Sequence, residues 1–451
     1  MSQPLFFCFA PCPRGLEGLL VQELETLPLA GLGQVLKVTP APGGVSFQAD
    51  WAGIMQANLW SRCASRILLR LDKKSYRNEQ DIYDIALAQP WTDWFDLAND
   101  FKVDLTALTG RRAAPTEGTR TKQPPPAGKR TKPASVSHLQ SLDFVTLRVK
   151  DAVCDHFRER TGQRPDINTQ HPDIRIHVFL DDISCTLYLD TSGDALFKRG
   201  WRLEKGEAPI RENLAAGLLQ LANWPERAAA GLTLLDPFCG SGTLLVEAML
   251  QQLQVAPGLA RSFAFECLRP CPLEQWQQVK QQARQQIQLQ PLNQIHGSDI
   301  DQKMVYRARR NIERAAILYG LPENLPLPTV AMSSADEKAP PAPQGLIICN
   351  PPYGERMQVQ ANRDSVHPAP EETDALFSHW ATQLKRHYAG WSVYVISADM
   401  QLPKRLRLKE SQRLPLFNGP LECRYFRFDM VSGSARHKPS QDSANPGMTP
   451  A

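Results

Sequence analysis

The sequence of 451 residues predicts an α/β protein, with a doubly wound sheet in its C-terminal half and a smaller α+β region in front of it. Two observations carry this prediction. In the C-terminal half, short apolar runs end in turns with glycine or acidic residues and lead into helical patterns, as parallel strands joined by helices do. In the N-terminal half, short strand candidates surround helical segments. At this length we expect two or three domains, and 42% hydrophobic residues suffice for ordinary cores.

The N-terminal half alternates between strand and helix patterns. An apolar strand is followed by a helix whose leucines recur at helical spacing from Leu16 to Leu24. The segment 144–157 fits a strand or a helix entry followed by one helical face. The other predicted elements are strands at 6–10, 34–38, 44–48 and 65–72, a helix at 51–62, and a strand pair at 174–180 and 185–189. Together they predict a compact α+β module.

Two segments have the composition of disordered chain. Residues 111–133 contain seven basic residues, five prolines, one acid (Glu117) and no large apolar residue. This basic insertion either contacts nucleic acid or is only solvated, and the sequence leaves both open. The net charge of the whole chain, +4, is too small by itself to indicate nucleic acid. The end of the chain, 431–451, is predicted to be a disordered tail.

The first motif of the C-terminal half follows the apolar run 232–235. Asp236-Pro237-Phe238-Cys239-Gly240-Ser241-Gly242-Thr243 leads into the helical pattern 244–250. The two glycines let a ligand approach the backbone, and the helix start offers unpaired N–H groups. The turn lacks the lysine of a P-loop and the GxGxxG spacing. The acid Asp236 instead suits a cationic ligand such as S-adenosylmethionine, which carries an ammonium and a sulfonium.

Two further strand candidates end in acids. The run 294–297 is followed by Asp299, whose carboxylate would lie where a ribose diol lies in a doubly wound sheet. The run 328–332 is followed by Asp336, whose carboxylate could accept a hydrogen bond from an adenine N6 amine. Either acid alone would more often be a helix cap or a turn residue. A series of such strand ends in the right order favours a cofactor site.

The fourth strand end is the most informative. The apolar run 346–349 stops at Asn350-Pro351-Pro352-Tyr353, where two prolines prevent further strand pairing. This turn predicts a clamp for a planar NH2 group, in which the Asn350 amide oxygen and the Pro351 carbonyl accept two N–H bonds and Tyr353 stacks beside them. Strands are also predicted at 391–397 and 423–428, with a hairpin-type turn at Asn418-Gly419.

These motifs, DPFCGSGT, GSDID, Ala335-Asp336 and NPPY, resemble those of class I (Rossmann-like) S-adenosylmethionine-dependent methyltransferases that act on exocyclic or amide nitrogens, over about residues 206–430. Four N-terminal segments resemble THUMP-containing rRNA methyltransferases, in particular the guanine-N2 half of the bacterial fused 23S rRNA enzymes. These segments are CPRGLE at 12–17, LRVKDA at 147–152, DIRIHV at 173–178 and LYLDTSGDALFKRGWR at 187–202. Two features depart from that pattern: the basic insertion is longer, and this sequence contains no counterpart of the second methyltransferase half.

The resemblance implies the domain organisation and the site. We expect a ferredoxin-like subdomain at 1–65, a THUMP RNA-binding domain at 66–190, a linker at 191–205 and a methyltransferase domain at 206–430. The implied catalytic residues are Asn350, Pro351 and Tyr353. The residues expected to bind S-adenosylmethionine are Asp236, Pro237, Phe238, Gly240, Gly242, Thr243, Asp299, Ile300, Asp336, Asn350, Pro209 and Arg211.

The implied activity is the formation of N2-methylguanosine in 23S rRNA or a large-subunit precursor, at a position of the 2445 type. Guanine-N2 or adenine-N6 methylation of tRNA, glutamine-N5 methylation of a release factor, and an inactive RNA-binding assembly factor remain as alternatives. The clamp accepts any of these amines, and the THUMP-like front half favours RNA.

We also expect a cytoplasmic monomer without a metal and without a membrane segment. The ten cysteines lack CxxC spacing, which favours free thiols in a reducing compartment. Cys239 and Cys349, which lie within the motifs, are expected to be buried packing residues. No apolar stretch reaches membrane-spanning length, and the apolar run 5–10 has no basic leader.

Overall fold

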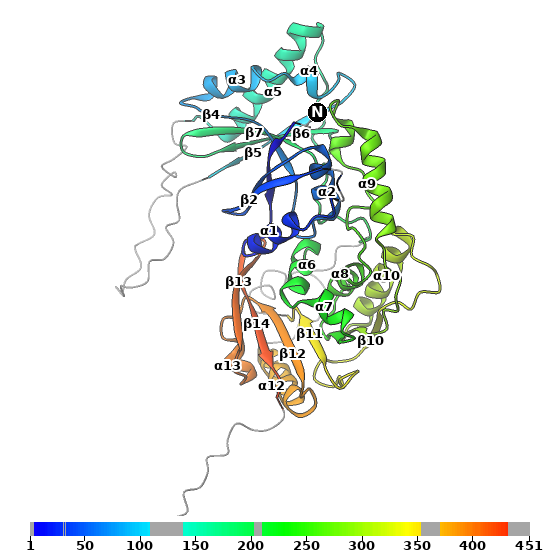
Figure 1. The fold of residues 1–451 in the computed structure, drawn as a ribbon. Coiled ribbons are helices and arrows are strands. Elements are labelled where there is room, and N and C mark those ends of the chain that lie inside the picture. The colour runs from blue at the N-terminus through cyan, green and yellow to red at the C-terminus, as the bar shows by residue number, and fades with distance from the viewer. Residues whose placement is uncertain are drawn as a thin grey trace, which may run out of the picture.

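The computed structural model describes residues 4–29, 31, 33–108, 139–202, 210–352 and 370–431, with the helical backbone alone for 370–373 (Figure 1). The predicted basic insertion at 111–133 and the predicted tail beyond residue 431 lie outside these ranges. So do two predicted site residues, Pro209 and Tyr353. The described part of the chain forms two seven-stranded sheets, one above the other in Figure 1.

The N-terminal sheet is built from β1 (Phe6–Pro11), β2 (Val35–Ala41), β3 (Gly44–Ala49), β4 (Leu68–Ser75), β5 (Phe101–Ala107), β6 (Ile174–Leu180) and β7 (Ser184–Asp190). Their order is β2-β3-β1-β4-β7-β6-β5, and only β5 and β6 are parallel neighbours. The strand β4 pairs with β1 on one side and with β7 on the other. One continuous sheet therefore runs through the expected subdomain 1–65 and the expected domain 66–190.

The helices of this half are α1 (Glu17–Glu25), α2 (Trp51–Trp60), α3 (Glu79–Leu87), α4 (Trp91–Trp94) and α5 (Leu142–Thr161). The segment 144–157, which the sequence allows as a strand or a helix entry, is helical throughout. Helix α5 begins after Ser141, whose hydroxyl accepts a hydrogen bond from the N–H of Phe144, and ends at Gly162 in the left-handed region. Along β6, alternate residues are buried, and they join the core that the helices complete.

The C-terminal sheet is built from β8 (Thr233–Asp236), β9 (Ile295–Asp299), β10 (Thr329–Met332), β11 (Gly345–Cys349), β12 (Trp391–Ser397), β13 (Gln412–Asn418) and β14 (Leu421–Asp429). Their order is β10-β9-β8-β11-β12-β14-β13. The strands are parallel from β10 to β12, and β14 is antiparallel to β12, as predicted for the final strand. The predicted hairpin turn joins β13 to β14, with Gly419 at positive φ.

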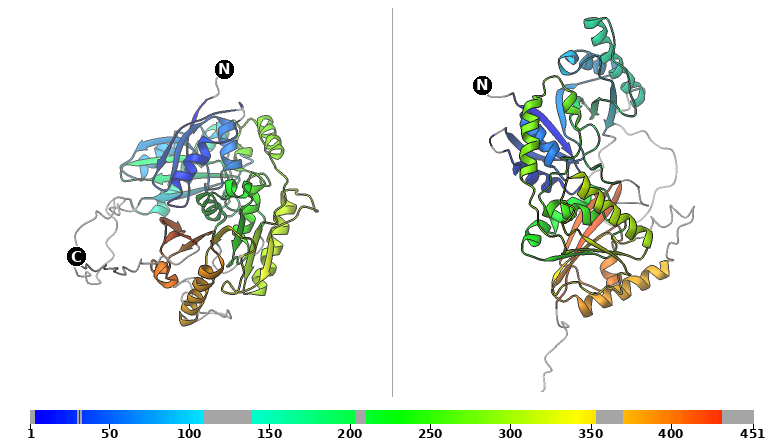
Figure 2. Two further views of the ribbon diagram at one scale, coloured as in Figure 1. Left: turned by 60° about the horizontal axis from the view of Figure 1, so that its bottom comes forward. Right: turned by 90° about the vertical axis from the view of Figure 1, so that its right-hand side faces the viewer.

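Helices cover both faces of this sheet in the views of Figure 2. The helices of this half are α6 (Glu212–Leu221), α7 (Trp224–Ala229), α8 (Thr243–Gln252), the 3-10 turn η1 (Ala264–Cys267), α9 (Leu273–Gln285), α10 (Gln302–Leu318), α12 (Pro370–His387) and α13 (Leu402–Leu406). Of these, α9 contacts α2 and η1 contacts β6, so both lie against the N-terminal half. The doubly wound sheet behind a smaller α+β region confirms the predicted fold class.

Buried polar contacts connect the N-terminal and C-terminal halves of the chain. The guanidinium of Arg199 lies 3.3 Å from the carboxylate of Glu247 on α8, and both side chains are almost fully buried. Arg199 also donates to the carbonyl of Arg62, and Arg62 donates to the carbonyl of Val255. Because a buried charge without a partner is costly, these contacts fix one arrangement of the two sheets.

The described residues contain no group of three or more His, Cys, Asp or Glu side chains placed to hold a metal ion. None of the described helices is long and apolar enough to cross a membrane. All ten cysteines are free thiols. Cys239 and Cys349 are buried, as predicted, and burial raises the pKa of both thiols well above the ordinary value, which keeps them protonated.

Candidate active site

The candidate site lies at the carboxyl edge of the parallel strands. Because β9, β8 and β11 are parallel neighbours, their carboxyl ends lie side by side. Asp299 ends β9, Asp236 ends β8, and Asn350 directly follows β11. The structure thus brings together three residues that are far apart in the sequence. Asp336, four residues after β10, follows the next strand of the same edge.

The two glycines of the turn after β8 are required for different structural reasons. Both have positive φ, +52° at Gly240 and +81° at Gly242. A Cβ at Gly240 would meet no atom within 4 Å, so this position leaves open space beside the turn. A Cβ at Gly242 would lie 3.0 Å from the Cβ of Ala308 on α10. Gly240 therefore faces space that a ligand can use, whereas Gly242 allows close packing of α10.

Asp236, which is buried, and Asp299, which is half-buried, lie close enough for their charges to interact. Asp236 accepts a hydrogen bond from the N–H of Phe238 at 3.1 Å. Burial raises the pKa of Asp236 to about 8, with the Phe238 N–H opposing the shift and the charge of Asp299 adding to it. Asp299 accepts from the N–H groups of Gly240 and Asp301, both at 2.9 Å, and burial raises its pKa too. A carboxylate has about four acceptor sites, so Asp299 keeps capacity for a ligand diol.

Asn350 carries one of several buried polar atoms that have no partner among the described residues, and it lies at the carboxyl end of β11. Its Oδ1 is buried and accepts no hydrogen bond among the described residues. Pro351 beside it is buried as well, and the strand before it, β11, is buried throughout. A buried acceptor without a donor costs about 1–3 kcal/mol, so this oxygen is placed for a donor supplied by a ligand. An amine N–H is such a donor.

The remaining predicted residues surround this edge in different ways. Phe238 is half-buried, and its ring meets that of Trp380 on α12 edge-on at 5.2 Å. Asp336 accepts from the hydroxyl of Ser334 and lies 3.7 Å from the imidazole of His379. Ile300 is 75% exposed. Pro237 is buried at the start of the turn. Arg211 precedes α6, with its guanidinium 5.0 Å from the ring centre of Phe197.

Sequence reasoning missed Arg202, which braces the glycine turn. Its guanidinium donates to Glu212 at 2.8 Å, to the hydroxyl of Ser241 at 3.0 Å and to the hydroxyl of Thr243 at 2.7 Å. Asn311 of α10 holds the same turn by donating to the carbonyl of Ser241. Thr243, predicted to bind the cofactor, thus has its hydroxyl occupied as an acceptor. No local motif marks these partners, although Arg202 closes the segment 187–202.

An open glycine turn, carboxylates at two neighbouring strand ends and a doubly wound sheet with an antiparallel last strand define a class I methyltransferase, and S-adenosylmethionine is the cofactor of this class. Comparison with protein families agrees. The model of the RMKL-like methyltransferase domain matches residues 199–427, just over half of the chain. The chain belongs to this family. The RlmL ferredoxin-like domain matches residues 8–68, and the THUMP domain matches residues 128–190.

Several known proteins are similar to this chain over most of its length. Ribosomal RNA large subunit methyltransferase K/L of Syntrophotalea carbinolica is 35% identical over 96% of this chain and 54% of its own length. The enzyme of the same name from Methylococcus capsulatus is 35% identical over 94% of this chain and 51% of its length. The chain thus spans about half the length of these relatives. A Listeria monocytogenes structure, described as a predicted N6-adenine-specific DNA methylase, is 26% identical over 95% of this chain and 97% of its own, with a TM-score of 0.73.

Proposed function

We propose that this chain transfers a methyl group from S-adenosylmethionine to the exocyclic N2 amine of a guanosine in large-subunit rRNA. The observation that carries this proposal is the buried, unpartnered Oδ1 of Asn350 at the carboxyl end of β11, on the same edge as Asp236 and Asp299. The THUMP domain and the names of the K/L relatives support RNA, and ribosomal RNA of the large subunit in particular.

The chemistry follows from the clamp. The lone pair of a guanine N2 amine is delocalised into the ring, which makes it a poor nucleophile. Asn350 Oδ1 and the Pro351 carbonyl accept the two N–H bonds and hold the nitrogen toward the methyl group. Bound S-adenosylmethionine supplies an activated methyl on a positively charged sulfur, so no base is required before transfer and the amine proton leaves afterwards. Catalysis is then positioning and electrostatics.

The other site residues take the following roles in this proposal. Asp236 loses its proton when the cationic methionine end of the cofactor binds, and its carboxylate then accepts from that end. Asp299 accepts from the ribose diol, and Asp336 accepts from the adenine amine. The target base leaves its helix and stacks on Tyr353, which costs a few kcal/mol of unstacking. Naked or partly assembled rRNA is therefore the better substrate. We further propose that the protein acts in the cytoplasm as a monomer, which light scattering of the purified protein tests.

One experiment separates the substrates. Purified protein is incubated with isotope-labelled cofactor and deproteinised 23S rRNA, and the nucleosides are identified by mass spectrometry. The expected product is N2-methylguanosine at one position of the 2445 type. Label in N6-methyladenosine, or only in a tRNA or a release-factor glutamine offered in parallel, keeps the amine clamp and overturns the proposed substrate.

Replacement of the clamp tests the mechanism. Asn350→Ala is expected to lower turnover by about 10²–10³, the effect of removing one preorganised polar group, while the affinity for S-adenosylmethionine stays nearly unchanged. Asn324→Ala, in an exposed turn, is the matched control. Rates under single-turnover conditions give the comparison. Turnover of the Asn350 variant within about twofold of the native rate shows that the amide is not the clamp.

A further inference from the structure

One face of the N-terminal sheet carries aromatic rings and cations instead of core residues. Strand register places Phe7 and Phe9 of β1, Arg70 of β4 and Tyr188 of β7 on this face, and the rings of Phe9 and Tyr188 lie 6.5 Å apart. The opposite face packs in one hydrophobic core with α1, α2 and α5 through buried residues such as Leu69, Leu189, Ile176 and Val103. We call the face with Phe7 and Tyr188 the open face.

Phe7 is the most exposed of these three rings. It is 49% exposed, and the guanidinium of Arg70 lies 4.2 Å from its ring centre. Ring and guanidinium line a shallow pocket of about 550 Å³, large enough for a nucleotide, whose wall continues along β4 through Lys73 and Lys74. Both lysine side chains are more than half exposed, and each has an acidic neighbour, Asp181 at 3.9 Å for Lys73 and Asp72 at 3.0 Å for Lys74. Strand register places Lys73, opposite Thr186, on the open face, and Lys74, opposite Cys185, on the other face. The pocket lining holds one acid, Asp72, against three cations. The pocket therefore suits an anionic ligand with a flat ring.

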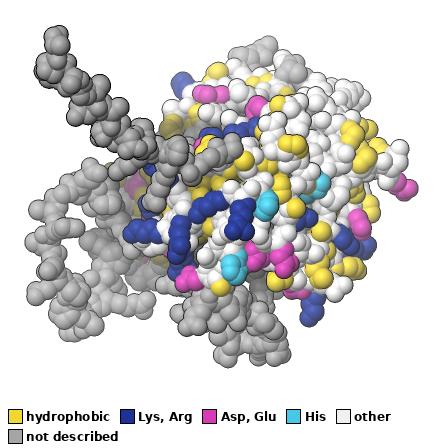
Figure 3. Space-filling model, turned by 90° about the horizontal axis from the view of Figure 1, so that it is seen from below, with side chains coloured by type: hydrophobic (Ala, Val, Ile, Leu, Met, Phe, Trp, Pro, Cys, Tyr) yellow, Lys and Arg dark blue, Asp and Glu magenta, His cyan; other side chains and the backbone are white. Residues whose placement is uncertain are grey.

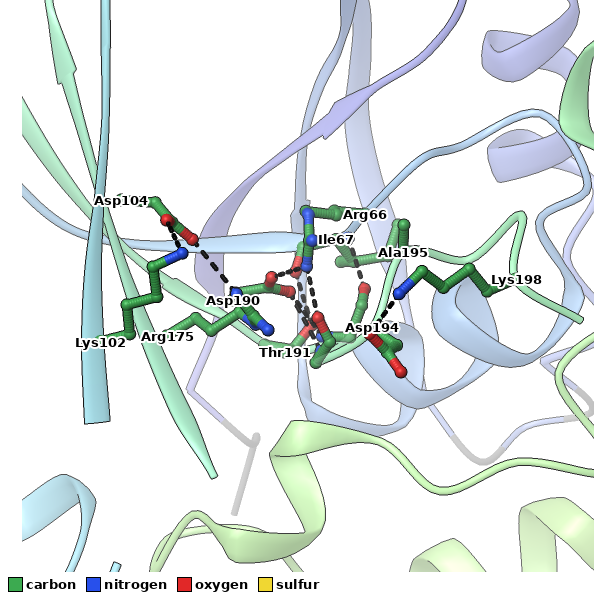
Figure 4. A network of polar contacts seen from close by, with 12 residues as sticks. Arg66, Ile67, Lys102, Asp104, Arg175, Asp190, Thr191, Asp194, Ala195 and Lys198 are labelled. Atoms are coloured by element: carbon green, nitrogen blue, oxygen red, sulfur yellow. Dashed lines mark hydrogen bonds and ion pairs between the residues drawn. The ribbon is translucent and has the colours of Figure 1, made fainter. Parts of the chain in front are cut away.

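Further cations continue along the open face toward the methyltransferase domain (Figure 4). Lys102 and Arg175 share the carboxylate of Asp104, at 2.8 and 3.4 Å. Arg66 pairs with Asp190, and Lys198 pairs with Asp194. Four cations thus face three carboxylates, and the Nε of Arg175 is buried without a hydrogen-bond partner in the described structure. The row ends one residue from Phe197, which contacts Arg211 at the start of α6.

A single exposed phenylalanine is ordinary on a protein surface. Three rings on one sheet face, the outermost of them exposed, with cations between and beside them, form the arrangement that stacks unpaired bases and holds their phosphates. Paired bases of a duplex cannot reach the rings. We propose that the open face docks a single-stranded segment of the RNA substrate, with one base stacked on Phe7 and its phosphates held by Arg70 and Lys73. This inference rests on the proposed function and adds to it the place where unpaired RNA enters.

Fluorescence anisotropy with a labelled single-stranded RNA of about 12 nucleotides, and with the same strand paired into a duplex, tests the open face. Phe7→Leu is expected to weaken binding of the single strand by about tenfold, since stacking on one ring contributes about 1–3 kcal/mol. Phe7→Tyr keeps the ring and should bind within about twofold of the native protein. Phe144→Leu, an exposed phenylalanine on α5, is the matched control. Cofactor affinity, measured by calorimetry, confirms that each variant is folded.

Salt dependence separates phosphate binding from stacking. Lys73→Gln should reduce the log-log salt slope by about 0.7, for the one phosphate that this lysine neutralises, whereas Phe7→Leu should leave the slope unchanged. Native affinity in Phe7→Leu, or an equal decrease for single strand and duplex, overturns the docking surface. If the native protein forms N2-methylguanosine and Phe7→Leu binds RNA with native affinity, only the docking surface is refuted. If Phe7→Leu binds RNA more weakly but the native protein methylates no guanosine, only the proposed function is refuted.

Discussion

At the scale of single residues, the candidate site depends on carboxylates at the strand ends. Asp299, the half-buried last residue of β9, is fixed by two backbone N–H groups, so its remaining acceptor sites point in a set direction. A carboxylate that is already oriented loses little freedom when it accepts from a diol.

Asp299→Ala is therefore expected to weaken S-adenosylmethionine binding by about 1–3 kcal/mol, the contribution of a charge-assisted hydrogen bond to a ribose. Isothermal titration calorimetry measures the affinity. Asp143→Ala, an exposed acid in the first turn of α5, should change nothing. Unchanged affinity in the Asp299 variant would remove this residue from the cofactor site.

Asp236 gives a pH-dependent prediction. Its folded-state pKa of about 8 lies above the unfolded value of about 3.8, so between these pH values the folded protein holds a proton that the unfolded chain has released. The contribution of this carboxyl to stability is then present below about pH 4 and falls as the pH rises to about 8. Asp236→Asn should remove up to about 1.4 kcal/mol per pH unit from the slope of unfolding free energy against pH. Chemical denaturation at several pH values tests this, and parallel profiles for both proteins would contradict it.

The strand-end residues could be predicted from the sequence because each motif is contiguous. A strand, its terminal acid or asparagine and the following turn lie within ten residues, and parallel order brings their ends to one edge. Arg202 was out of reach because its partners Glu212, Ser241 and Thr243 lie 10, 39 and 41 residues away. Only the fold brings Arg202 close to these three partners.

At the scale of elements, the turn between β8 and α8 is the junction on which the site depends. Gly242→Ala should destabilise the protein in two ways, through a left-handed backbone, at about 1–2 kcal/mol, and through a clash with Ala308, at about 1–3 kcal/mol. Gly231→Ala is a matched control, because Gly231 has a similar φ of +78° and no atom within 4 Å of its Cβ position. Thermal unfolding compares them. Equal losses of stability in both variants would show that α10 packing is unimportant here.

Two strands, β5 and β13, escaped prediction for different physical reasons. The strand β5 carries Lys102 and Asp104, which pair with each other and with Arg175 of the neighbouring strand β6, 71 residues further along the chain, so the charged pattern did not indicate a strand. The strand β13 contains Pro415, and a proline within a run argues against a strand. It is tolerated because β13 is the last strand of its sheet, where the missing N–H has no partner to lose.

At the scale of the whole molecule, the basic insertion 111–133 is the segment with the largest excess of positive charge that the sequence singles out. Figure 3 shows Lys and Arg side chains on the face seen from below, with Asp and Glu among them. The basic insertion 111–133 carries seven cations against one acid and connects β5, an edge strand of the N-terminal sheet, to α5. Its attachment beside the open face would add cations for phosphate binding to those of the sheet.

Replacing residues 111–133 by a Gly/Ser linker of equal length should lower the affinity for rRNA and flatten its salt dependence, by about 0.7–0.9 in log-log slope for each phosphate that the insertion neutralises. A second variant with the seven basic residues changed to glutamine separates charge from length. Filter binding over a range of salt concentrations gives the slopes. Identical slopes in all three proteins would show that the insertion is only solvated.

The strand β4 has a consequence for how this chain can be divided. It pairs with β1 and β7 at once, so a cut at residue 68, where the ferredoxin-like match ends, divides a sheet and not a linker. A fragment expressed from either side of that cut would present an unpaired strand edge, and such edges template aggregation. The two regions therefore form one folding unit. Gene fusion or shuffling can move them together, and we do not expect a fragment of either region alone to be soluble.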